Sequence, residues 1–251
     1  MAVHYRTQGF VLKKEDFREA DQIFSIYTKD FGKLEVLGRA IRKIKSKLRP
    51  GADIFYLSEI EFIQGKNYKT LTDATVINKF PEIRKDLNKL EIAYQITENA
   101  NELIRGEEKD EAVFNLLNEV FNKLNNWKIE NSLNPVFSQK SGGKLKIICH
   151  YFIWNLLSIL GYQIDLYHCV KCQKKLNPGI MNFSPRNNGI VCFRCSNGAL
   201  KDKILITSET IKILRLFLKN NWNILSRLKI DQELKEPLEK FSRIYFSHIQ
   251  T

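Results

Sequence analysis

The stretch DQIFSIYTKDFGKLEVLG, residues Asp21–Gly38, decides the fold of the N-terminal part of the chain. In Asp21–Thr28 the side chains of Ile23 and Ser25 share one face of an extended chain and those of Phe24 and Ile26 share the other. Lys33–Gly38 shows a similar alternation, and the turn sequence Lys29–Gly32 separates the two runs. A period of two places successive side chains on opposite faces of an extended strand. The pattern therefore predicts two strands joined by a tight turn.

Three further runs of the same kind lie around this pair, at Tyr5–Lys14, Ile54–Ile63 and Tyr68–Ile77. The charged stretch Lys14–Arg18 is expected to end the first run, and the glycine-containing turn Gln64–Asn67 joins the last two. Five short strands within about 80 residues suit a closed barrel better than an open sheet, because closure removes unpaired strand edges. We therefore predict a small N-terminal β-barrel.

From Pro81 onward the apolar period becomes helical. One helix is expected to begin at Pro81, and others span Glu111–Leu124, Val136–Leu160, Ser208–Asn220 and Gln232–His248, with Pro237 as a possible true start of the last. The third helix is apolar on most of its sides, which indicates a central helix packed by its neighbours. We predict an α+β multidomain chain with parts at 1–80, 81–161, 162–203 and 204–251.

Four of the five cysteines form two pairs, Cys169-x-x-Cys172 and Cys192-x-x-Cys195. Two such knuckles can close a tetrahedron of four thiolates around one metal ion, typically zinc. Four sulfurs leave no position open for water or substrate, so the predicted zinc is structural. His168 is interpreted as a surface residue rather than a ligand, and Cys149 as a small core residue.

A strongly basic segment, RAIRKIKSKLR, lies between two predicted barrel strands. The formal net charge of the chain is +12, which favours polyanionic partners, although an AT-rich coding background would also enrich lysine. The segment contains no acidic residue, and such clusters bind phosphates by releasing counterions. Its six cations are our candidate nucleic-acid contacts: Arg39, Arg42, Lys43, Lys45, Lys47 and Arg49.

No motif of nucleotide hydrolysis, zinc-protease or serine-hydrolase chemistry is found in the sequence, so no catalytic residue is predicted and the chain is not expected to be an enzyme. The most apolar stretch, Ile147–Leu160, is shorter than the roughly 20 residues that cross a bilayer. Since no signal peptide is visible either, we expect a cytoplasmic, nucleoid-associated protein without a membrane partner.

Several N-terminal motifs resemble those of the RecO family of bacterial DNA repair and recombination mediators. They are Gly9–Leu12, Glu19–Asp21, Tyr27–Lys33, Gly38–Ala40 and Lys45–Lys47, followed by a helical middle and the four cysteines. The resemblance extends over essentially the whole chain. It implies an OB-fold barrel, a helical domain and an embedded zinc-finger module.

The resemblance also implies a function, which is ATP-independent annealing of complementary single strands and help in replacing single-stranded-DNA-binding protein (SSB) by the RecA recombinase. The implied partners are single- and double-stranded DNA, RecR, the acidic C-terminal tail of SSB and, indirectly, RecA. Two other interpretations stay open at this point. One is an RNA- or ribosome-binding barrel with a zinc ribbon, and the other is a zinc-dependent hydrolase.

Overall fold

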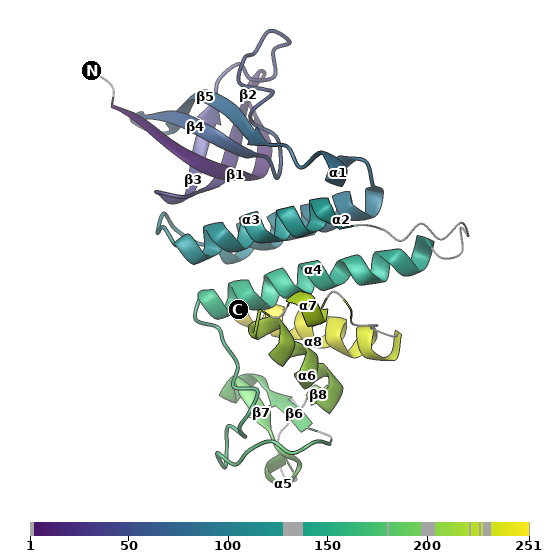
Figure 1. The fold of residues 1–251 in the computed structure, drawn as a ribbon. Coiled ribbons are helices and arrows are strands. Elements are labelled where there is room, and N and C mark those ends of the chain that lie inside the picture. Colours follow the sequence, from purple (N-terminus) through teal and green to yellow (C-terminus); the bar gives the residue numbers. More distant parts are fainter. Residues whose placement is uncertain are drawn as a thin grey trace. The chain divides into compact units, whose positions relative to one another are not determined.

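The computed structural model describes residues 3–127, 138–179, 181–196, 204–220, 222–225, 227 and 232–250. The chain divides into two compact units, Met1–Phe152 and Ile153–Thr251. Unit 1 holds a closed barrel and helices, and unit 2 holds helices with a small sheet (Figure 1). The predicted α+β class, with an N-terminal five-stranded barrel, a mostly helical remainder and a four-cysteine module, is confirmed.

The barrel strands are β1 (His4–Phe17), β2 (Asp21–Thr28), β3 (Gly32–Gly38), β4 (Leu57–Gln64) and β5 (Lys69–Asn78). They close in the order β1-β2-β3-β5-β4, with β1 also paired to β4. All neighbours are antiparallel except β3 and β5, which are parallel. This is the strand order of an OB-fold.

Two strand boundaries differ from the sequence prediction by more than one residue. β1 continues through the charged stretch to Phe17, because Lys14, Asp16 and Phe17 still pair with β2 while their side chains reach solvent. The expected start of β4 at Ile54 is wrong, since Phe55 has a left-handed backbone with φ of 57° and its N–H bonds to the Val11 carbonyl at 2.8 Å. That conformation cannot continue a strand, so β4 begins at Leu57.

The turn between β2 and β3 is fixed by Thr28 and Gly32, two residues of the Tyr27–Lys33 motif. The Thr28 hydroxyl donates to the Gly32 carbonyl at 2.8 Å and accepts from the Phe31 N–H at 3.1 Å. Gly32 has φ of 66°, and a Cβ there would lie 2.3 Å from the Glu108 carbonyl oxygen. Only glycine fits this close approach of two backbones.

The helices of unit 1 are α1 (Pro81–Arg84), α2 (Leu87–Leu103), α3 (Glu111–Asn126) and the first part of α4 (Ser138–Ile159). The helical pattern from Pro81 is not one helix, because Asp86 caps a new start by accepting from the N–H groups of Asn88 and Lys89. Leu87, the first residue of α2, is 84% exposed.

Phe10 joins the barrel to these helices. Its ring lies on the outside of β1 and packs against Phe80, Phe114 and Phe121, with centroid separations of 5.4–6.4 Å. The Tyr27 hydroxyl adds a second link, since it donates to the Asp110 carbonyl at 3.0 Å and accepts from the Asp110 N–H at 3.1 Å. The helices therefore form the platform on which the barrel is held.

Unit 2 contains the rest of α4 and a three-stranded antiparallel sheet in the order β7-β6-β8. Its elements are β6 (Met181–Ser184), the 3₁₀ turn η2 (Pro185–Asn187), β7 (Gly189–Val191), α5 (Phe193–Ser196), β8 (Ile204–Ile206), α6 (Ser208–Leu218), α7 (Trp222–Leu225) and α8 (Gln232–Gln250). The α8 helix begins before Pro237, which lies inside it, so the alternative start at that proline is wrong.

The apolar character of α4 is explained by its packing. Within the described side chains from Leu145 onward, nearly all apolar residues of this helix are buried, including Cys149 and Trp154. The Trp154 ring stacks on Phe241 and Tyr245 of α8. No helix in the described part of the chain is both long and apolar enough to cross a bilayer.

Candidate nucleic-acid surface and metal centre

The basic segment, residues 39–49, is a series of turns between β3 and β4 and contains no helix. All six predicted contact residues are exposed. The segment is fixed to the barrel by Ile41, which is buried in the core, and by Leu48, which packs partly against it. The Ala40 N–H bonds to the Asp21 carboxylate at 2.7 Å, and the Arg42 N–H bonds to the Ala20 carbonyl at 3.1 Å. The apolar residues hold the loop while the cations face solvent.

Of these six cations, Arg42 has a carboxylate partner, Asp16, at 3.2 Å. Across the described residues, the other five make no ion pair. The segment is therefore not neutralised by acidic neighbours, which keeps its charge available to an anionic ligand.

A hollow of about 540 Å³ lies beside the segment and has both charge signs in its lining. Its acids are Asp16, which pairs with Arg42, and Asp53, which pairs with Lys14 at 2.5 Å and with Arg84 at 2.7 Å. The lining residues are Lys14, Asp16, Gln22, Ile41, Arg42, Arg49, Ala52 and Asp53. Each of these two aspartates is already in an ion pair, so the hollow adds little net charge. The positive charge of this surface comes mainly from the basic segment.

The structure also separates packing aromatics from exposed ones, which the sequence could not do. Phe10, Phe24, Phe55 and Phe62 are buried, whereas Tyr68 is 41% exposed. Tyr68 lies in the β4–β5 turn, and its ring is 5.8 Å from that of Phe17 at the end of β1. This aromatic pair was missed because alternation in a strand does not show which strand ends meet in space.

Arg18 completes this group. It follows Phe17 in the β1–β2 turn with φ of 53°, and its guanidinium lies 5.0 Å from the Phe17 ring centroid. A non-glycine residue in the left-handed region is strained and is often found where function requires it. The same turn contains Ala20, which bonds to the basic segment, so the aromatic pair and the cations lie on adjoining loops of the barrel. In OB-folds the β1–β2 and β4–β5 loops contact ligands.

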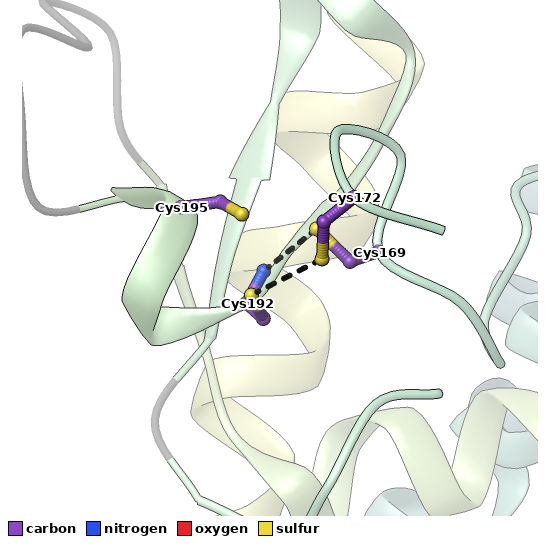
Figure 2. Close-up of side chains that lie close together, drawn as sticks. All are labelled: Cys169, Cys172, Cys192 and Cys195. Carbon is purple, nitrogen blue, oxygen red and sulfur yellow. Dashed lines mark hydrogen bonds between the residues drawn. The ribbon is translucent and has the colours of Figure 1, made fainter. Parts of the chain in front are cut away.

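The four paired cysteines come together in unit 2 (Figure 2). Their Sγ atoms all lie within 4.8 Å of one another, and the Cys172 and Cys192 sulfurs are 3.9 Å apart. A tetrahedral zinc with zinc–sulfur bonds of about 2.3 Å requires sulfur separations of about 3.8 Å. The Cys192 N–H points at the Cys169 sulfur at 3.4 Å, as amides do in metal knuckles.

The clustered thiols shift the pKa values of Cys169 and Cys195 in opposite directions. Burial opposes ionisation of Cys169, but donors from Cys192, Cys172 and Lys171 outweigh it and lower its pKa to about 6. The thiols of Cys172 and Cys192 hydrogen-bond to Cys195 and raise its pKa to about 12. Metal binding requires the thiolate form, so a thiophilic metal ion at this site would displace the thiol protons.

His168 and Cys149 lie outside the sulfur cluster, as the sequence predicted. His168 is exposed, and its Nδ1 lies 3.0 Å from Asp165 rather than among the sulfurs. Cys149 is buried in α4, and burial raises its pKa to about 12, so it is an unreactive core residue. In the described residues, the one group of three or more metal-ligating side chains is the cysteine set.

Taken together, the barrel order, the basic loop and the sulfur cluster define an OB-fold protein with a helical extension and a four-cysteine module. Family models agree with both parts. "Recombination protein O N terminal" matches residues 1–80, and "Recombination protein O C terminal" matches residues 130–248. The chain belongs to the RecO family of DNA repair proteins.

Individual relatives support the same assignment. The chain is 30% identical over 235 residues to DNA repair protein RecO of Dehalococcoides mccartyi (strain CBDB1), a match that covers 94% of this chain and 86% of the relative. It is 28% identical over 240 residues to DNA repair protein RecO of Thermoanaerobacter sp. (strain X514), covering 96% and 90%. The resemblance inferred from the N-terminal motifs is thus confirmed.

Proposed function

We propose that this chain is a non-enzymatic recombination mediator that binds single- and double-stranded DNA. In this proposal it anneals complementary, SSB-coated strands without ATP and, with RecR, assists loading of RecA during recombinational repair. The C-terminal tail of SSB is its acidic partner, and RecA is reached indirectly. Family membership supports the repair role, and the charge of the barrel loop supports the binding chemistry.

The observation that carries the proposal is the basic segment, which presents six exposed cations on a loop anchored to a closed barrel. Cations of this kind gain affinity by releasing counterions from phosphates, so they need no particular base sequence. Annealing requires that same indifference, because two backbones must be screened while their bases stay free to pair. Neither the screening of the two backbones nor the pairing of their bases requires hydrolysis of a nucleoside triphosphate.

The aromatic pair of Phe17 and Tyr68 gives the surface a second kind of contact. Unpaired bases stack on exposed rings, and each such contact contributes about 1–3 kcal/mol with little sequence preference. In the proposed complex Phe17 and Tyr68 receive bases, while Arg18 and the basic segment hold phosphates. Duplex DNA hides its base faces, so it uses the cations alone.

The proposed metal is one structural zinc bound by Cys169, Cys172, Cys192 and Cys195. The separation of the sulfurs and the Cys192 N–H that points at the Cys169 sulfur support this ligand set. A shell of four thiolates stabilises the loops that carry it and offers no coordination position to a substrate. A hydrolytic role for this metal is therefore disfavoured.

The decisive experiment is annealing of complementary DNA strands coated with SSB, without ATP. We expect the protein to speed duplex formation well above the rate of SSB-coated strands alone. Simple DNA affinity with no acceleration would contradict the mediator role. Competition between DNA and RNA of equal length and salt tests the RNA-binding alternative, which a strong preference depending on the 2′-hydroxyl would favour.

Replacement of Arg39, Arg42 and Lys43 by alanine tests the surface itself. We expect weaker binding to every DNA sequence, and a logarithmic salt dependence that is shallower by about 2, since each phosphate contact on single strands contributes about 0.7. The control removes three exposed cations elsewhere in unit 1, namely Lys79, Arg105 and Lys109. If the salt dependence of the first variant is unchanged, or if the control changes it equally, the phosphates do not bind at the basic segment.

A further inference from the structure

The loops around the cysteines are basic in their own right. Residues 166–196 contain five lysines or arginines and no aspartate or glutamate. The cations are Lys171, Lys174, Lys175, Arg186 and Arg194, and all five are exposed. A zinc ion with four thiolates has a formal charge of −2, so a charge of about +3 remains after the metal centre is counted. The excess is not explained by the metal alone.

A hollow of about 720 Å³ opens beside the sulfurs, within unit 2. Three cations and one exposed ring contribute to its lining, and the lining contains no acid. The lining residues are Cys172, Lys174, Lys175, Asn177, Pro178, Gly179, Met181, Cys192, Phe193, Arg194 and Cys195. Its volume is in the range of small-ligand pockets, and it contrasts with the hollow beside the barrel loop, where two aspartates take part.

The cysteine loops set the walls of this hollow. Lys174 and Lys175 follow the first knuckle, where the Lys174 carbonyl accepts from the Cys169 N–H at 2.9 Å and Lys175 forms a β-bridge with His168. Phe193 lies in α5 between the two cysteines of the second knuckle, and 58% of it is exposed. A large ring held in solvent at this position is not used for packing, so it is available to a ligand.

We propose that this hollow binds an unpaired nucleotide of a second DNA strand, with its base on Phe193 and its phosphates on Lys174, Lys175 and Arg194. A nucleotide joins a flat ring to a phosphate in one unit, which matches an exposed ring flanked by cations. An acidic peptide would need separate acidic and apolar residues at a fixed spacing. The inference rests on the proposed function and extends it, because annealing needs two strands and the barrel surface provides for one.

The test uses the full chain with its metal and a thymidine-rich strand carrying 5-bromodeoxyuridine. Irradiation should cross-link the strand to the peptide that contains Phe193, as mass spectrometry can show. A second measurement is energy transfer between two non-complementary labelled strands, which reports whether both are held together. We expect the change of Lys174 and Lys175 to glutamine to reduce this transfer at least fivefold.

The matched control changes Lys212 and Lys240, two exposed lysines of the same unit, to glutamine. It removes the same charge and should leave strand bridging unchanged. Phe193→Ala should lose the cross-link at that peptide, and equal zinc content shows that each variant has kept its fold. Since the Lys174 and Lys175 variant changes exposed side chains alone, it remains informative if Phe193→Ala fails to fold.

The outcomes separate this inference from the proposed function. If the wild-type chain binds no DNA, the proposed function fails. If it binds DNA but shows no cross-link near Phe193, and the Lys174 and Lys175 variant bridges strands as well as the control, this inference alone is overturned. A synthetic aspartate-rich peptide that binds the hollow when DNA does not would also overturn it, in favour of a protein partner.

Discussion

The barrel and the four-cysteine module are both small, but they are stabilised in different ways. The barrel surrounds a continuous apolar core, in which Phe24, Ile26 and Ile60 are fully buried. The knuckle loops of the module instead converge on four sulfurs. The three-stranded sheet next to these loops is stabilised partly by apolar packing, because Phe183 of β6 packs edge-on against Phe241 and Tyr245 of α8. A distributed core tolerates exposed functional loops, whereas the module, if it binds the proposed zinc, would concentrate its stability at one point.

The largest effect should come from loss of a metal ligand. Cys172→Ser is expected to abolish zinc binding, which contributes about 10–16 kcal/mol in small zinc-finger peptides. Hydrogen exchange should rise sharply in the two knuckles, while the β6 strand, packed on α8, and the barrel strands keep their protection. Metal analysis checks the loss of zinc, and hydrogen-exchange mass spectrometry checks where protection is lost. Exchange that rises equally in the barrel would show that the two regions are not independent.

A change in the barrel core should give the reverse pattern. Phe24→Ala empties a fully buried site and should cost about 3–5 kcal/mol. Denaturant unfolding followed by barrel signals measures the loss, which should be the same with and without a zinc chelator. Ile44→Ala is the control, because Ile44 is 93% exposed and its removal should change stability by less than about 0.5 kcal/mol. If the stability lost in Phe24→Ala depends on the chelator, the barrel and the four-cysteine module are not independent.

The smallest effect tests the strained turn of the barrel. Asparagine tolerates the left-handed backbone, so Arg18→Asn should leave stability within about 0.5 kcal/mol while removing the cation above Phe17. In the proposed complex Arg18 holds a phosphate, and loss of one exposed ion pair of about 0.5–1 kcal/mol corresponds to a two- to fivefold loss of single-strand affinity. Fluorescence anisotropy can measure it beside Arg105→Asn, an equal charge change on another loop. Equal losses in the two variants would argue that charge alone matters at this turn.

Much of the fold followed from local patterns. The alternation in Asp21–Gly38 predicted β2 and β3 almost to the residue, and the cysteine spacing predicted which sulfurs would meet. Both signals are strong because they depend on neighbours in the sequence. The break at Asp86 was missed, since a single capping residue leaves the apolar period on either side intact.

Other features depended on contacts between distant parts of the chain. The left-handed Phe55 and the meeting of Phe17 with Tyr68 arise from closure of the barrel. The pairing of β8 with β6, and the hollow bounded by Phe193 and Lys175, likewise require the folded module. The sequence could show that cations were abundant in the basic segment, but their exposure, and the single ion pair that Arg42 makes with Asp16, needed the structure.

The parallel pairing of β3 and β5, here called the seam, closes the barrel and affects the rate at which the protein folds. In the parallel pairing of β3 and β5, Val36 lies beside Lys69 and Leu37 beside Thr70. The β1–β2–β3 meander and the β4–β5 hairpin consist of sequence neighbours and should form early, whereas the seam must wait for closure of the intervening connection. The basic segment is the first part of that connection, and its like charges repel and extend it in the unfolded chain. Dissolved salt screens this repulsion and should therefore speed refolding, although it would weaken the proposed phosphate contacts.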